Sequence, residues 1–237
     1  MPKSSRVTLL GLVLLALIAG AAVSEDIQGQ RTLPVIADTF QFIPGSWAVY
    51  DFYDINKDAH SKIYFSIDKL ETKHRDKKEI PCFWMEVEIK TPNEPTVATR
   101  VLAEETKTGP GELFGVTVQI EGHKPFKVPA KYYKGKDSKV SEFQPIKTES
   151  KAEKKTITWK DKTLTAYEVE ATDENGKKTK AVVSEEVPPL AIISIKSSEM
   201  EMTLEDWGMD AKSKIKGSPM SFYLWLFLET GKGIIGQ

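Results

Sequence analysis

Apolar and polar residues alternate along several stretches of the chain, which is the pattern of β-strands with one buried face. The clearest stretch is 199–205, where Met200, Met202 and Leu204 alternate with polar residues. Successive side chains of a strand point to opposite faces, so each such stretch has one apolar and one polar face. This arrangement is typical of antiparallel sheets. Similar alternation recurs at 63–68, 83–90, 114–120 and 167–172.

Turn sequences separate these stretches at short intervals. Asn56-Lys57-Asp58 lies between two of them, and the Asn-Gly pair of 173–176 favours the positive φ angles of a type I′ hairpin turn. Short connections favour antiparallel neighbours over parallel crossovers. We therefore predict a mainly β fold with roughly ten strands, in a single domain spanning 25–237.

Two segments are candidates for short helices. The first is 33–42, and the second follows Ser218-Pro219, which offer an N-cap and a first-turn proline. Residues 220–228 are apolar nearly all round, and a short helix of that kind is expected in a protein interior. We predict a curled antiparallel sheet, an incomplete β-barrel, whose concave apolar face is covered by these short helices.

The N-terminus has the three parts of a secretory signal peptide. Lys3 and Arg6 precede an apolar run at 7–19, and small residues at Ala22 and Ser24 suit cleavage after residue 24. The run is shorter than the about 20 apolar residues that span a bilayer, although an uncleaved anchor remains an alternative. We predict that 1–24 is a signal peptide and that the mature protein is exported, to a periplasm or outside the cell.

Composition excludes several classes of protein. The chain has 33 Lys+Arg against 34 Asp+Glu, a formal net charge of −1 that disfavours a strongly basic nucleic-acid binder. Its one cysteine, Cys82, excludes an intramolecular disulfide and a cysteine-rich zinc site. Cys82 lies in an apolar stretch, so we expect a buried thiol.

No motif for chemistry is complete. Residues 54–58 imitate the start of a calcium loop, but Ala59 replaces the required glycine and Phe65 the bidentate glutamate, which favours a plain hairpin turn. A Gly-x-Ser-x-Gly elbow is absent from the sequence. We predict no catalytic residue, no metal site and no cofactor. The histidines all lie in or beside polar turns: His60, His74 and His123.

The second half of the chain resembles a known family. The segment 182–190 contains a Val-Pro corner and leads into the apolar strand 192–196, and Met202–Gly208 and Ala211–Gly217 follow. This order is similar to that of secreted proteins of unknown function in the lipoprotein-carrier (LolA/LolB-like) superfamily. The resemblance implies an incomplete barrel whose concave face admits acyl chains. None of the carrier family's functional residues has a counterpart here.

These observations predict an exported, non-enzymatic protein that binds a lipid or a lipoprotein acyl chain on the concave face of its sheet. Each methylene moved from water onto that face would contribute about 0.8 kcal/mol. Contact with a membrane would be peripheral at most, and no nucleic-acid partner is expected. One alternative is an envelope module for structure or protein interaction with a solid core, in which the same side chains are plain core; a secreted hydrolase is less favoured. The predicted ligand-binding residues are Phe83, Met85, Val87, Met200, Met202, Leu204, Leu224 and Phe227.

Overall fold

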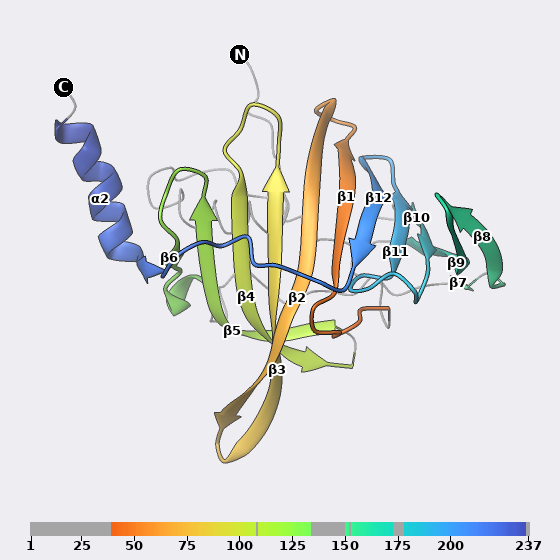
Figure 1. Cartoon of the computed structure of the whole chain (residues 1–237), viewed down its shortest axis with the longest axis horizontal. Helices are drawn as coiled ribbons and strands as arrows, with labels where there is room; N and C mark the ends of the chain where they lie inside the picture. Colours follow the sequence, from red (N-terminus) through yellow and green to blue (C-terminus); the bar gives the residue numbers. More distant parts are fainter. Residues whose placement is uncertain (1–38, 108, 134–149, 152, 173–177, 236–237) are drawn as a thin grey trace.

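One large curled sheet, open at both edges, dominates the computed structural model of the protein (Figure 1). The structure describes residues 39–107, 109–133, 150–151, 153–172 and 178–235. Within these ranges thirteen strands belong to the sheet. The longer strands are β1 (Trp47–Asp54), β2 (Ala59–Arg75), β3 (Lys78–Lys90), β4 (Val97–Thr106), β5 (Gly109–Ile120), β8 (Lys155–Trp159), β9 (Lys162–Thr172), β10 (Lys178–Val183), β11 (Ile192–Lys196) and β12 (Met200–Gly208). Three strands have two residues each: β6 (Phe126–Lys127), β7 (Ser150–Lys151) and β13 (Met220–Ser221).

The strands run in two antiparallel meanders that meet at β1. Strands β1 to β6 follow one another in the sheet, β12 to β9 continue it on the other side of β1, and β7 and β8 both pair with β9. The exception is β13, which runs parallel to β6 at the sheet edge. The predicted curled antiparallel sheet is thus confirmed. Two-residue strands are too short to alternate, so the sequence pattern cannot reveal them.

The predicted turn at 54–58 joins β1 to β2. Its backbone is shaped locally, because the Asn56 N–H donates a hydrogen bond to Asp54 Oδ1 at 3.0 Å and Asp58 has a φ of 51°. Strands β9 and β10 pair antiparallel from Thr172 and Lys178, as a hairpin requires. The Asn-Gly turn predicted between them lies outside the described residues, as does the predicted signal peptide.

The core occupies one face of the sheet. Alternate residues of β1, β2, β3 and β12 point into it, with Tyr50, Ile63, Phe83 and Met202 almost completely buried. A smaller apolar cluster lies on the opposite face, where Cys82 packs near Ile80 and Leu102. The expectation of a buried thiol is confirmed, and burial raises the pKa of Cys82.

The helix α2 (Phe222–Ile235) stands beside β6 at one end of the sheet (Figure 1). The prediction that this segment covers the concave face is therefore wrong. The strand β13 pairs with the edge strand β6 immediately before the helix, which fixes α2 at the edge. The helix also begins later than predicted, at Phe222. The residue before it, Ser221, accepts a hydrogen bond at Oγ from the Leu224 N–H at 3.3 Å. In the other candidate helix, 33–42, only 39–42 are described, and they are not helical.

The segment 209–219, called here the crossing segment, runs from β12 to β13 over the outer face of the sheet (Figure 1). It is held at several points across the sheet. The Ala211 N–H donates to the Gly45 carbonyl at 2.9 Å, the Lys216 N–H donates to Gln119 Oε1 on β5 at 2.7 Å, and Met220 N–H donates to the Pro125 carbonyl at 2.9 Å. Through this segment the second meander is connected to the far edge of the first.

Candidate functional site

The residues predicted to bind an apolar ligand divide into two groups in space. Six of them lie together on the core face of β3 and β12: Phe83, Met85, Val87, Met200, Met202 and Leu204. All except Met200 are at most 3% exposed, and Met200 is partly buried against the same cluster. The Phe83 ring contacts the rings of Phe40 and Phe42, with centroid distances of 5.8 and 4.6 Å. The surroundings of these side chains are therefore those of a protein core.

The other two predicted residues, Leu224 and Phe227, are separate from this group. They lie on α2, which is attached to the sheet edge by two aromatic side chains. Trp225 is 9% exposed, and its ring lies 4.3 Å from that of Phe126 on β6. Phe222 is buried as well, with its ring 5.9 Å from Phe126. Since residues three positions apart share one side of a helix, these two rings form the face of α2 that packs on the sheet.

The opposite side of α2 is apolar and exposed. Tyr223 is 59% exposed, Leu224 49%, Phe227 71% and Leu228 42%. These four residues form two pairs spaced by four positions and so cover one continuous strip of the helix surface. We call this strip the outer face of α2. A solvent-exposed helix face ordinarily carries polar residues, and an exposed apolar patch usually marks an interaction site.

Lysines surround the base of this helix. Lys124, Lys127 and Lys131 are exposed, and we call them the basic rim. Lys131 Nζ lies 5.8 Å from the ring centre of Tyr223 and 4.9 Å from that of Tyr132. The side-chain hydrogen bond with Tyr223 raises the pKa of Lys131, so this lysine keeps its charge. The outer face and the basic rim together place a cationic border next to an apolar strip.

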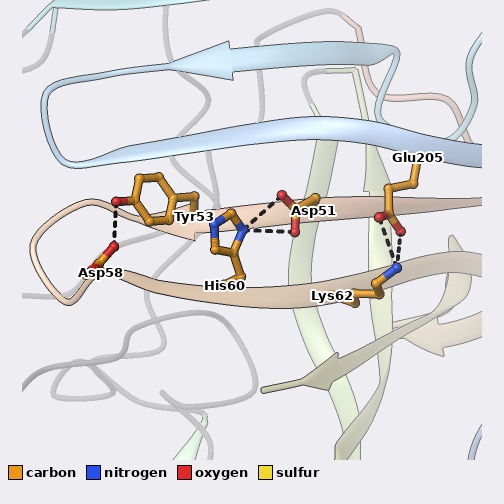
Figure 2. A network of polar contacts seen from close by, with 6 residues as sticks. All are labelled: Asp51, Tyr53, Asp58, His60, Lys62 and Glu205. Atoms are coloured by element: carbon orange, nitrogen blue, oxygen red, sulfur yellow. Dashed lines mark hydrogen bonds and ion pairs between the residues drawn. The ribbon is translucent and has the colours of Figure 1, made fainter. Parts of the chain in front are cut away.

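A polar network on the outer face of β1, β2 and β12 is the best-connected alternative site. Figure 2 shows its members, Asp51, Tyr53, Asp58, His60, Lys62 and Glu205. His60 Nδ1 lies 3.1 Å from Asp51 Oδ2, and the His60 ring stacks on Tyr53 at 4.6 Å. Lys62 Nζ donates to both oxygens of Glu205 at 2.9 Å.

An aspartate that orients a histidine is a feature of nucleophilic catalysis, where the histidine activates a serine or cysteine. Here the serine nearest to His60 in the sequence is Ser61, and its hydroxyl forms a hydrogen bond with the Thr91 hydroxyl at 2.9 Å. The side chains of His60 and Asp51 are 60% and 38% exposed, so water screens the pair. The network is best explained as cross-strand stabilisation of a sheet surface.

A small cleft of about 240 Å³ lies between β9 and the segment after β10, lined by Lys154, Thr165, Tyr167, Glu185 and Glu186. Both glutamates of this cleft already have a polar partner in the protein. Glu185 pairs with Lys154 at 3.2 Å, and Glu186 accepts a hydrogen bond from the Thr165 N–H at 2.7 Å. The cleft is smaller than most ligand sites and carries charge on both sides, which does not suit an apolar ligand.

Neither metal binding nor a membrane span finds support within the described ranges. No group of three or more histidine, cysteine or acidic side chains is clustered there as metal ligands would be. No helix in the same part of the chain combines the length and apolar character that crossing a bilayer requires. The outer face of α2 is therefore the strongest candidate site that the structure offers. The sequence pattern identified Leu224 and Phe227 as apolar contacts but gave no sign that Tyr223 and Lys131 lie beside them.

Comparison with known proteins adds little. No family model matches the chain, and no curated protein matches it. Among solved structures, one that matches is the crystal structure of "a putative lipoprotein from Parabacteroides distasonis ATCC 8503", with a TM-score of 0.38 and 12% identity, over 73% of this chain and 99% of that one. That likeness contains nothing specific to the lipoprotein-carrier superfamily, so the resemblance drawn from the sequence stays a prediction.

Proposed function

We propose that this protein is an exported, non-catalytic lipid-binding protein that contacts lipid through the outer face of α2. The observation that carries the proposal is the exposure of Tyr223, Leu224, Phe227 and Leu228 on one strip of a helix whose other side is anchored by Trp225. Burying the apolar surface that these side chains still expose to water is favourable, in proportion to the area removed, so an apolar partner is favoured.

Export is proposed from the N-terminal sequence, with its short basic region, apolar run and small residues. The absence of catalysis is proposed because the described polar clusters are exposed or internally paired. An acyl chain bound on the core face is less well supported, since Phe83 and its neighbours already pack against one another there.

Flotation with vesicles tests the proposal directly. The wild-type protein and the double variant Leu224→Ser/Phe227→Ser are mixed with vesicles of phosphatidylcholine and phosphatidylglycerol at low salt, and the bound fraction is measured. We expect the wild type to bind and the double variant to lose most binding. Leu70→Ser is the matched control, because Leu70 is 50% exposed on β2, and three strands lie between β2 and β6.

Two outcomes contradict the proposal. The first is a wild-type protein that does not bind these vesicles. The second is a double variant that binds as well as Leu70→Ser, since lipid would then be held elsewhere on the molecule. Circular dichroism of each variant establishes that the sheet remains folded.

A further inference from the structure

Two residues of the basic rim, Lys124 and Lys127, are held next to α2 by backbone pairing. Met220 pairs with Phe126 and Ser221 with Lys127 in the parallel β13–β6 ladder, so Lys127 lies beside the residue that precedes the helix. Lys124 is adjacent to Pro125, whose carbonyl accepts from the Met220 N–H at 2.9 Å. The position of these lysines relative to α2 is therefore fixed by strand geometry rather than by flexible side chains alone.

The local charge differs from that of the whole chain. The protein as a whole has a formal net charge of −1, whereas the basic rim contributes three positive charges around the start of α2. The acidic residue nearest to it on the helix, Glu229, faces His123, whose Nδ1 lies 3.0 Å away. An apolar strip with a cationic border complements an anionic lipid surface, where apolar side chains enter the acyl region and lysines remain at the phosphates.

We infer that α2 docks the protein on an anionic membrane surface, with the outer face inserted among acyl chains and the basic rim on the lipid phosphates. This inference rests on the proposed lipid-binding function. The 14 residues of α2 extend about 21 Å, less than the about 30 Å of a bilayer core, so the helix lies in the interface. Tyr223 suits that depth, because its ring is apolar and its hydroxyl polar.

The aromatic contacts of Lys131 point to the same depth. Its ammonium group lies close to the rings of both Tyr132 and Tyr223, at the start of the exposed strip. Tyrosine and lysine side chains both suit a membrane interface, because each combines an apolar part with a polar or charged end.

The test compares neutral with anionic lipid headgroups, and a variant of the basic rim with a control variant. Flotation of the wild type is measured with vesicles of phosphatidylcholine alone and with vesicles containing phosphatidylglycerol, at low and at high salt. We expect tighter binding to the anionic vesicles and a loss of that difference at high salt. Lys127→Gln/Lys131→Gln should weaken binding to anionic vesicles about 25-fold, at about fivefold per lysine. Lys155→Gln/Lys178→Gln, exposed lysines of β8 and β10, is the matched control.

Equal binding to neutral and anionic vesicles, or a rim variant that behaves like its control, overturns the inference while lipid binding itself stands. Failure of the wild type to bind any vesicle instead overturns the proposed function. Sedimentation velocity tests whether a second copy of this chain, rather than a membrane, occupies the outer face of α2. A dimer that Leu224→Ser/Phe227→Ser dissociates would also overturn the inference.

Discussion

Ser213 and Glu86 lie 127 positions apart in the chain, yet the Ser213 hydroxyl donates a hydrogen bond to Glu86 Oε2 at 2.8 Å. The Lys214 N–H donates to the other carboxylate oxygen. Glu86 is only 1% exposed on the outer face of β3, although it belongs to the polar side of an alternating strand. A buried carboxyl group thus helps to fix the crossing segment to the middle of the sheet.

Replacing Glu86 tests how much this attachment contributes to stability. Glu86→Ala leaves the Lys214 N–H and the Ser213 hydroxyl without their acceptor, and should lower the free energy of unfolding by about 2–3 kcal/mol. Glu86→Gln should change it by less than about 1 kcal/mol, because the amide oxygen can accept from Lys214 and the amide nitrogen can donate to Ser213. Urea denaturation measures both. Equal losses for the two variants would mean that the hydrogen bonds do not hold the segment.

The stability of the protein should also depend on pH through the ionisation of Glu86. Burial raises the pKa of Glu86 above 4.5, against the opposing hydrogen bonds from Lys214 and Ser213 and the charge of Arg100. A carboxyl group with a raised pKa binds its proton more readily in the folded state. Its contribution to stability is therefore greatest below pH 4.5 and is lost as the pH rises through the folded-state pKa.

We expect the free energy of unfolding of the wild type, relative to that of Glu86→Gln, to decrease as the pH rises from 4.5 towards neutrality. Comparison with the variant is needed because Glu71 and Glu121 have lowered pKa values and act in the opposite sense, losing stability as the pH falls through them. Urea denaturation of both proteins across this range gives the difference. If the difference in free energy of unfolding between the wild type and Glu86→Gln does not change with pH, the raised pKa of Glu86 is contradicted.

Gly45 is the point where the beginning of the sheet meets the crossing segment. Its φ is +81°, and a Cβ placed there would lie 2.8 Å from the Met209 carbonyl oxygen. Gly45→Ala should therefore lower the free energy of unfolding by about 3 kcal/mol, from left-handed backbone strain and a clash with backbone. Gly122 has a similar φ of +79° but open space around it, so Gly122→Ala should show the strain alone, about 1 kcal/mol. Similar losses of stability in the two variants would exclude the clash with the Met209 carbonyl as a cause.

The faces of the strands were predictable because alternation defines them. Phe83, Met85 and Val87 were placed on one apolar face, and so were Met202 and Leu204, and the structure has both sets in the core. The hairpin turn at 54–58 was also predictable, since its residue types favour turns locally. These are features that a short stretch of sequence determines by itself.

The positions of α2 and of the crossing segment were not predictable. An all-round-apolar helix has no polar side to indicate which face packs, so the pattern of 220–228 could not distinguish a buried helix from one anchored at an edge. The burial of Glu86 depends on a polar segment without periodicity, 127 positions away. Both features arise from long-range packing, which local patterns do not record.

Trp225 is one of the two aromatic side chains that attach α2 to the sheet, and its ring packs on Phe126 at the edge strand β6. Trp225→Ala should weaken this attachment by about 3 kcal/mol. The helix joins the sheet mainly at β6 and β13, so the loss should be local. We expect faster amide hydrogen exchange in α2 with little change in β1 to β4, together with weaker vesicle binding.

Trp225→Phe separates ring packing from hydrogen bonding. Among the described residues, the buried indole nitrogen of Trp225 has no hydrogen-bond partner, so phenylalanine should cost less than about 1 kcal/mol. Trp84 provides the contrast, since its Nε1 donates to Glu71 Oε2 at 2.6 Å, and Trp84→Phe should cost about 1.5–3 kcal/mol because that bond is to a charged group. If Trp225→Phe loosens α2 as much as Trp225→Ala does, the helix is held by something other than the stacking of this ring on the edge strand.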